Sequence, residues 1–273
     1  CLAGTYNANT GSTTSSDCLD ADAGNYVGST GQSSQTACAA GTYQSTTGQS
    51  SCTDASAGYY VGSTGQSSQT ECAAGTYQAS TGQSACTDAS AGYYVDSTAQ
   101  TAQTACLAGT YNANTGSTTS SDCLDADAGN YVGSTGQTSQ TECAAGTYQA
   151  STGQSSCIDA DAGYYVPTTG QTSQTECAEG TYQSLTGQST CIDADPGYYI
   201  DAGGSSDQIP CALGTYQPDA GQTSCLDADP GYYVDSTTQT SQTACLAGTY
   251  NANTGSTTSS DCLDADAGNY VGS

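Results

Sequence analysis

The tripeptide Gly-x-Tyr recurs along this 273-residue chain at a fixed interval, which constrains the fold more than any other feature. The motif occurs 16 times, and successive Tyr residues are 17 positions apart, except at three places where the step is 20. Each longer step reads "NANTGSTTSSDC" where others read, for example, "QSTTGQSSC". Such periodicity is typical of proteins in which neighbouring repeats bury each other's surfaces. The unit is therefore a 17-residue half-module that accepts three extra residues in one loop.

Each half-module has the local sequence of a short β-hairpin. "GTYQ" and "GYYV" favour a strand because aromatic and β-branched residues fit a pleated surface. The following "STTG" or "GSTG" supplies turn residues, and no segment shows the 3.6-residue apolar period of a helix. Since a lone hairpin is marginal in water, stacking and covalent bonds must add stability. The predicted fold is all-β, small and disulfide-rich: an elongated tandem-repeat rod of short β-hairpins built from 34- or 37-residue modules.

The 16 cysteines alternate between two positions of the half-module. Aligned on Gly-x-Tyr, one half fills an early position (Cys52) and has Ala55 at a late position three residues on. The next half has Gln69 at the early position and fills the late one with Cys72. This alternation suggests that each late Cys bonds the next early Cys, and that Ala55 and Gln69 mark a bridge lost as a pair. Pairing across the 20-residue gaps, such as Cys18 with Cys38, is the alternative.

This scheme predicts eight disulfides and eight modules. The predicted disulfides are Cys1–Cys18, Cys38–Cys52, Cys72–Cys86, Cys106–Cys123, Cys143–Cys157, Cys177–Cys191, Cys211–Cys225 and Cys245–Cys262. The predicted modules span 1–37, 38–71, 72–105, 106–142, 143–176, 177–210, 211–244 and a truncated 245–273. Closing a loop of about 15 residues contributes roughly 3 kcal/mol, which is comparable to the stability a small module needs.

Composition explains why disulfides are needed and where the protein works. The chain has 34 Gly and no Phe, Trp or Met, so it buries little aliphatic and aromatic area against the entropy of its chain. An even number of regularly spaced Cys is typical of oxidising compartments, and no His or Cys-x-x-Cys pair is present to chelate zinc. We therefore expect an extracellular or cell-surface location.

The charge is entirely negative: 26 Asp and Glu, with no Lys, Arg or His, give a net charge of −26. Nucleic acid is thereby excluded as a partner, because binding phosphates requires protein cations. No apolar run in this segment is long enough for insertion into a membrane. Catalysis is not expected, since the Ser residues have no His or Lys as a base and every candidate residue recurs in each module.

The segment "CAAGTYQSTTGQSSC" resembles the ephrin-receptor-like cysteine-rich repeat, whose units read roughly C-P-x-G-T-Y-x-x-x-x-G-x-x-x-C-x-x-C. The resemblance extends over essentially the whole chain as eight tandem modules. This sequence departs from the family pattern because it lacks the second Cys of the C-x-x-C step. The resemblance implies an extracellular, disulfide-laddered rod that serves as a spacer or interaction stalk and has no enzymatic activity.

Paired aspartates after the early Cys are candidate calcium ligands, although no cofactor is required by the composition. Two carboxylates in Asp-Ala-Asp resemble the opening of an oxygen-ligand calcium loop, but the complete D-x-D-x-D-G…E loop is absent. Solvated turn residues are the alternative interpretation. The candidate ligands are Asp20, Asp22, Asp125, Asp127, Asp159, Asp161, Asp193, Asp195, Asp227, Asp229, Asp264 and Asp266.

Hydroxyl-rich loops and tyrosines are the remaining candidate sites. The inserted loops are candidates for O-glycosylation, with bare polar loops as the alternative; the residues are Thr13, Thr14, Ser15, Ser16, Thr118, Thr119, Ser120 and Ser121. The Tyr of each Gly-x-Tyr is expected to stack along the array. A preceding Tyr in five half-modules is expected on the opposite strand face, available for contacts between chains; these residues are Tyr59, Tyr93, Tyr164, Tyr198 and Tyr232.

The predicted function is structural: an extracellular fibre, filament or stalk of disulfide-stapled repeats that carries covalent O-glycans and self-associates into fibres or bundles. The alternative is an adhesin or receptor stalk that binds a protein or glycan through repeated Tyr and Asp faces. Ice or mineral binding is disfavoured because regular Thr-x-Thr spacing is mostly missing.

Overall fold

A computed structural model describes residues 1–267 of the chain. The described part consists of 15 two-stranded antiparallel sheets and three 3-10 turns, and it contains eight disulfides. The prediction of an all-β, disulfide-rich tandem-repeat fold is thus confirmed. The sixteenth Gly-x-Tyr motif, at Tyr270, lies outside the described residues.

The chain divides into two compact units, and each strand has two residues. The first unit comprises 1–126, 132–140 and 153–155. Its elements are β1 (Thr5–Tyr6), η1 (Ser15–Asp17), β2 (Leu19–Asp20), β3 (Asn25–Tyr26), β4 (Thr36–Ala37), β5 (Thr42–Tyr43), β6 (Thr53–Asp54), β7 (Tyr59–Tyr60), β8 (Thr70–Glu71), β9 (Thr76–Tyr77), β10 (Thr87–Asp88), β11 (Tyr93–Tyr94), β12 (Thr104–Ala105), β13 (Thr110–Tyr111), η2 (Ser120–Asp122) and β14 (Leu124–Asp125).

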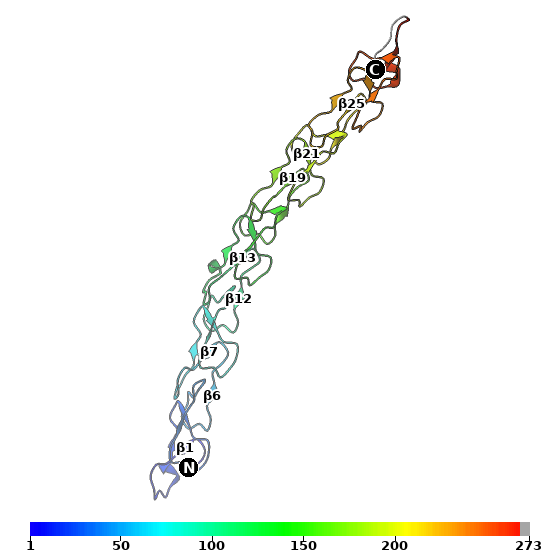
Figure 1. Cartoon of the computed structure of the whole chain (residues 1–273). Helices are drawn as coiled ribbons and strands as arrows, with labels where there is room; N and C mark the ends of the chain where they lie inside the picture. Colours follow the sequence, from blue (N-terminus) through cyan, green and yellow to red (C-terminus); the bar gives the residue numbers. More distant parts are fainter. Residues whose placement is uncertain (268–273) are drawn as a thin grey trace. The chain divides into compact units, whose positions relative to one another are not determined.

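The described part of the second unit comprises 127–131, 141–152 and 156–267. Its elements are β15 (Asn130–Tyr131), β16 (Thr141–Glu142), β17 (Thr147–Tyr148), β18 (Ile158–Asp159), β19 (Tyr164–Tyr165), β20 (Thr175–Glu176), β21 (Thr181–Tyr182), β22 (Ile192–Asp193), β23 (Tyr198–Tyr199), β24 (Ile209–Pro210), β25 (Thr215–Tyr216), β26 (Leu226–Asp227), β27 (Tyr232–Tyr233), β28 (Thr243–Ala244), β29 (Thr249–Tyr250), η3 (Ser259–Asp261) and β30 (Leu263–Asp264). Within each unit the hairpins follow one another in sequence order (Figure 1).

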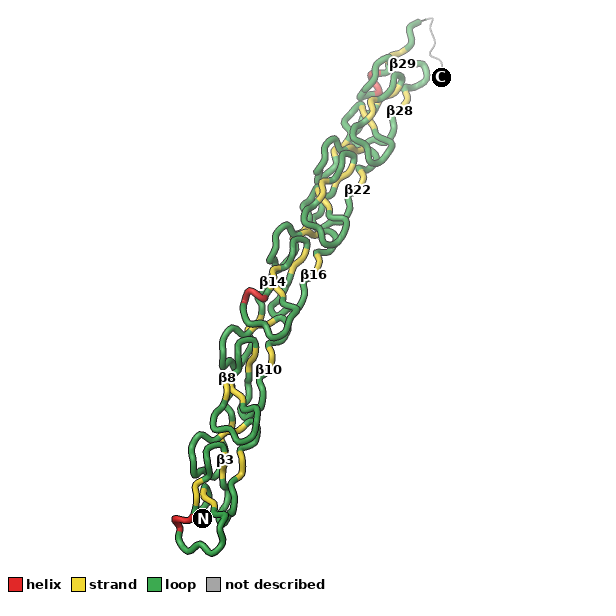
Figure 2. Tube along the Cα trace, turned by 90° about the vertical axis from the view of Figure 1, so that its left-hand side faces the viewer, coloured by secondary structure: helices red, strands yellow, loops and turns green. Residues whose placement is uncertain are grey.

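Each sheet pairs the strand of one Gly-x-Tyr with the strand that closes the same half-module. Tyr60 lies opposite Thr70 and Tyr59 opposite Glu71 in β7–β8. Most of the remaining chain is turns and loops, as the trace in Figure 2 shows. Strands this short are expected where Gly and turn residues recur every few positions, so the hairpins need other bonds for their stability.

Those other bonds are backbone hydrogen bonds between consecutive half-modules. In the first unit, the Gly24 N–H donates to the Gln44 carbonyl at 2.7 Å, and the Val27 N–H donates to the Gln49 carbonyl at 3.0 Å. In the second unit, the Gly163 N–H donates to the Gln183 carbonyl, 20 residues further on, and the Val166 N–H donates to the Gln188 carbonyl, 22 residues further on. Each hairpin is therefore bonded to the next along the backbone, which satisfies polar groups that the tiny sheets leave unpaired.

The Gly of Gly-x-Tyr is required by a second close approach of the backbone, to the half-module two positions further along the chain. Gly75 has a φ of +85°, in the left-handed region that favours Gly, and a Cβ added there would lie 2.5 Å from the Gly116 carbonyl oxygen. The second recurrent Gly, in the turn, is less constrained, since Ala99 occupies its place with a φ of +58°. The Gly-x-Tyr motif is thus a point of backbone contact between half-modules, in addition to a strand signal.

The buried core is a row of small side chains. The late position is buried in most half-modules whether it holds Cys38 or Ala55, both 0% exposed, although Cys1 is exposed and Cys245 half-buried; Val61 is 1% exposed. The equivalent of Val61 in the alternate half-modules is a Gln or Asn, buried in most of them, such as Gln44, whose side-chain amide donates to the Ser51 carbonyl at 2.9 Å. No helix within residues 1–267 is long and apolar enough to cross a lipid bilayer.

Candidate interaction surface

The structure joins all eight Cys pairs named in the sequence analysis. The bridges are Cys1–Cys18, Cys38–Cys52, Cys72–Cys86, Cys106–Cys123, Cys143–Cys157, Cys177–Cys191, Cys211–Cys225 and Cys245–Cys262, and no Cys is free in the described chain. Each closes a loop with a sequence separation of 14, or of 17 where the insertion is present. Late cysteines such as Cys72 are buried and their partners half-buried. Such bridges are typical of proteins that mature in an oxidising compartment.

A glutamine clamp occupies the place of the bridge that was inferred to be lost. Gln69 accepts a 2.7 Å hydrogen bond through Oε1 from the backbone N–H of Ser56, the neighbour of Ala55. The same bond, spanning 13 residues, recurs at Gln35, Gln103, Gln174, Gln208 and Gln242. Sequence reasoning treated this Gln only as a missing Cys. In the sequence, this Gln always follows the Asp or Ser of the clamp by 13 residues, and that constant spacing is the signal that could have revealed the bond.

The clamp also engages the second Asp of several Asp-Ala-Asp pairs. Gln35 Nε2 donates to Asp22 Oδ2 at 2.6 Å, and the equivalent carboxylates of Asp161, Asp195 and Asp229 accept the same bond. The first Asp of each pair lies on an exposed strand, as Asp20 does opposite Thr5. No three Asp, Glu, Cys or His side chains gather closely enough to hold a metal ion within residues 1–267. Calcium binding by these aspartates stays a prediction.

The hydroxyl-rich insertions form rigid exposed loops. Each contains a 3-10 turn capped by its own Asp, as in η2, where Asp122 Oδ2 accepts from the Thr118 and Thr119 N–H groups at 2.9 and 3.0 Å. In η3, the N–H groups of Thr258 and Thr257 lower the pKa of Asp261 below its ordinary value. All eight candidate O-glycosylation residues are exposed, although the Thr119 hydroxyl is hydrogen-bonded to that of Ser121 at 2.7 Å.

The tyrosines lie on alternating faces of the hairpins. The Tyr of the motif and the Tyr before it are half-buried in most half-modules, for example Tyr60 and Tyr59 in β7. Tyr59 also donates through its hydroxyl to Glu71 Oε1 at 3.5 Å. Both kinds of Tyr therefore present part of the ring to solvent, and neither forms a fully buried aromatic core.

A groove recurs where one hairpin meets the next beside a disulfide. In the first unit, one groove of ≈ 350 Å³ is lined by Tyr60, Glu71, Ala73, Thr76, Ala85 and Cys86. A second groove of ≈ 330 Å³ has Tyr94, Ala105, Leu107, Thr110 and Cys123 at the equivalent positions, with Asp125. In the second unit, Tyr131, Glu142, Ala144, Thr147 and Cys157 line a groove of ≈ 500 Å³. We call these three the disulfide-side grooves.

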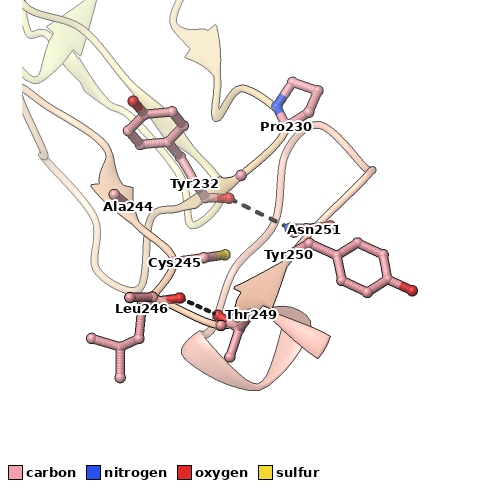
Figure 3. A pocket seen from close by; sticks show the side chains of 11 residues that line it. Pro230, Tyr232, Ala244, Cys245, Leu246, Thr249, Tyr250 and Asn251 are labelled. Atoms are coloured by element: carbon pink, nitrogen blue, oxygen red, sulfur yellow. Dashed lines mark hydrogen bonds between the residues drawn. The ribbon is translucent and has the colours of Figure 1, made fainter. Parts of the chain in front are cut away.

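A related hollow lies between β27 and β29. Its lining includes Tyr232 and Tyr250, which are 37% and 41% exposed, and Leu246, which is 80% exposed (Figure 3). The Asn251 amide donates to the Tyr232 carbonyl at 3.5 Å across the hollow, and the Thr249 hydroxyl donates to the Leu246 carbonyl at 2.8 Å (Figure 3). Aromatic rings, exposed aliphatic groups and backbone carbonyls thus alternate on this surface.

No protein-family model matches the chain, and no curated protein matches it either.

Proposed function

We propose that this chain is a structural segment of an extracellular fibre, filament or stalk, and that it has no catalytic role. The observation that carries the proposal is the continuous bonding between consecutive half-modules within each unit, with one disulfide in every module. In such an array stability comes from each repeat and its nearest neighbours, so length can grow without a large core. The ephrin-receptor-like resemblance supports the same role of spacer or stalk.

The charge and the loops support a solvated, glycan-bearing surface. A net charge of −26 keeps the segments of the chain apart and favours an extended rod. The insertions place four consecutive hydroxyl residues in a capped loop, at Thr13–Ser16 and at Thr118–Ser121. We propose that O-glycans attach there, where they protrude without disturbing the backbone ladder.

Electron microscopy and mass spectrometry of the protein from its natural source test this function. We expect elongated particles or filaments in negative stain, and a mass above that calculated for the polypeptide, which returns to the calculated value after O-deglycosylation. Compact particles under non-reducing conditions would contradict the fibre or stalk. A single unglycosylated mass would contradict the glycans alone.

A further inference from the structure

The three disulfide-side grooves share a chemical design in addition to their location. Each is lined by one motif Tyr, a Thr of the following hairpin and the half-buried Cys of a bridge: Tyr60, Thr76 and Cys86; Tyr94, Thr110 and Cys123; Tyr131, Thr147 and Cys157. The lining of each groove thus contains an aromatic ring and apolar side chains. Because the bridge fixes one wall, the groove is present without any rearrangement.

Carboxylates stand at the rim of this apolar surface. The strand register places Asp88 opposite Thr76, Asp125 opposite Thr110 and Asp159 opposite Thr147, and all three aspartates are exposed. Directly opposed residues of an antiparallel pair have Cβ atoms about 4.5–5.5 Å apart. Each groove therefore combines an aromatic ring with a carboxylate within one side-chain length of its lining. Glu71 and Glu142 add a second acidic residue to two of the grooves.

No side chain of this protein can neutralise these carboxylates. The sequence contains 26 Asp and Glu and no Lys, Arg or His, so a cation that pairs with a groove must come from another molecule. A guanidinium or ammonium group is attracted both by the face of an aromatic ring and by a carboxylate. Charge complementarity thus favours a basic polypeptide over a nucleic acid or another acidic chain.

We propose that the disulfide-side grooves are docking sites for a basic protein segment, with an Arg or Lys side chain over the Tyr ring and beside the rim Asp. Recurrence of the groove in successive modules allows several cationic side chains of one partner to bind at once, which raises overall affinity. This inference goes beyond the proposed structural role and does not depend on it, because binding is measured on the isolated chain.

An uncharged substitution separates groove binding from general attraction to an acidic chain. The probe is an octa-arginine peptide titrated calorimetrically in 0.15 M NaCl, where the Debye length of about 8 Å screens distant charges. The triple variant Tyr60→Leu, Tyr94→Leu, Tyr131→Leu removes the rings without changing net charge. We expect it to weaken binding by roughly 10- to 100-fold, since each exposed cation–π contact is worth about a two- to fivefold change. The corresponding Phe triple variant keeps the rings and is expected to bind as the unmodified chain does.

Matched controls keep the result interpretable. Tyr43→Leu, Tyr77→Leu and Tyr148→Leu change motif tyrosines of the alternate half-modules, which line none of the three grooves, and are expected to leave affinity unchanged. Circular dichroism and thiol counting check that both Leu triples remain folded and fully bridged; if the groove triple unfolds, the single variant Tyr94→Leu replaces it, with a two- to fivefold weakening expected.

Two results would overturn the proposal. One is equal octa-arginine affinity in the groove triple and the unmodified chain, because attraction would then depend on net charge alone. The other is binding of uncharged dextran that the groove triple abolishes, because the grooves would then be glycan sites.

Discussion

Replacing Gly75 by Ala tests whether the Gly of Gly-x-Tyr permits the close backbone approach of the half-module two positions further along the chain, which contains Gly116. A non-Gly residue in the left-handed region costs about 1–2 kcal/mol. The added Cβ would also lie 2.5 Å from the Gly116 carbonyl oxygen and 3.1 Å from Thr118 Cγ2, so the backbone must shift. Overpacking of this kind typically costs a further 1–3 kcal/mol. We expect Gly75→Ala to destabilise its surroundings by about 2–5 kcal/mol.

Gly65→Ala is the matched control. Gly65 has a φ of +73°, but the nearest atom to an added Cβ is Ala37 Cβ at 3.8 Å, which is ordinary contact. Only the conformational cost of about 1–2 kcal/mol applies there. The chain already accepts this substitution elsewhere, since Ala99 fills the equivalent turn position and donates to the Cys72 carbonyl at 2.9 Å.

Native-state hydrogen exchange measures both effects locally, because repeat arrays open in parts. The informative amide is Gly116, whose N–H donates to the Ala89 carbonyl of the half-module that contains Gly75 at 2.8 Å. We expect its protection to fall by roughly 30- to 5,000-fold in Gly75→Ala, and Gly65→Ala to reduce protection near the Cys38 carbonyl by about 5- to 30-fold. Equal losses in the two variants would refute the argument that backbone proximity, rather than φ alone, demands Gly.

Three further outcomes follow from the clamp, the bridges and the capped loops. Gln69→Ala removes the hydrogen bond to the Ser56 N–H and should destabilise its hairpin by about 0.5–1.5 kcal/mol, whereas Gln69→Glu keeps an acceptor there. Hydrogen exchange of the Ser56 amide distinguishes the two variants. Unchanged exchange in the Ala variant would exclude the clamp. When an optical tweezer unfolds a bridged module, only the 20 residues from Cys52 to Cys72 (72 − 52) can extend, which lengthens the chain by at most about 70 Å. Reduction of the bridge should free the 14-residue loop and lengthen each step by about 50 Å more. Unfolding steps of the same length with and without reductant would contradict the bridged loops. The pKa of Asp261 is lowered in the folded state, so its carboxylate stabilises η3 at pH values above the unfolded pKa, and this stability is lost as the pH falls through the folded pKa. A carboxyl NMR titration should give a midpoint below that of an ordinary Asp. Asp261→Asn should abolish this acid dependence of η3.

The repeat, the hairpins and the candidate bridges could all be predicted from the amino-acid order alone, because each depends on residues close together in the chain. Hairpins and loop closures are local, so turn residues, aromatic residues and Cys spacing specify them within a single half-module. Even the pairing of Cys38 with Cys52 could be argued from the alternation of two positions along the chain.

The bonds between half-modules could not be predicted in this way and became visible in the three-dimensional structure. That Gly24 donates to Gln44, that Gln69 clamps Ser56, and that a groove forms beside Cys86 depend on which residues neighbouring hairpins bring together. From sequence spacing, Gln69 was interpreted as the site of a lost cysteine, because an alignment of repeats does not show which backbone group a side chain contacts. In three dimensions its amide occupies the place of the missing bridge, and a hydrogen bond replaces the covalent one.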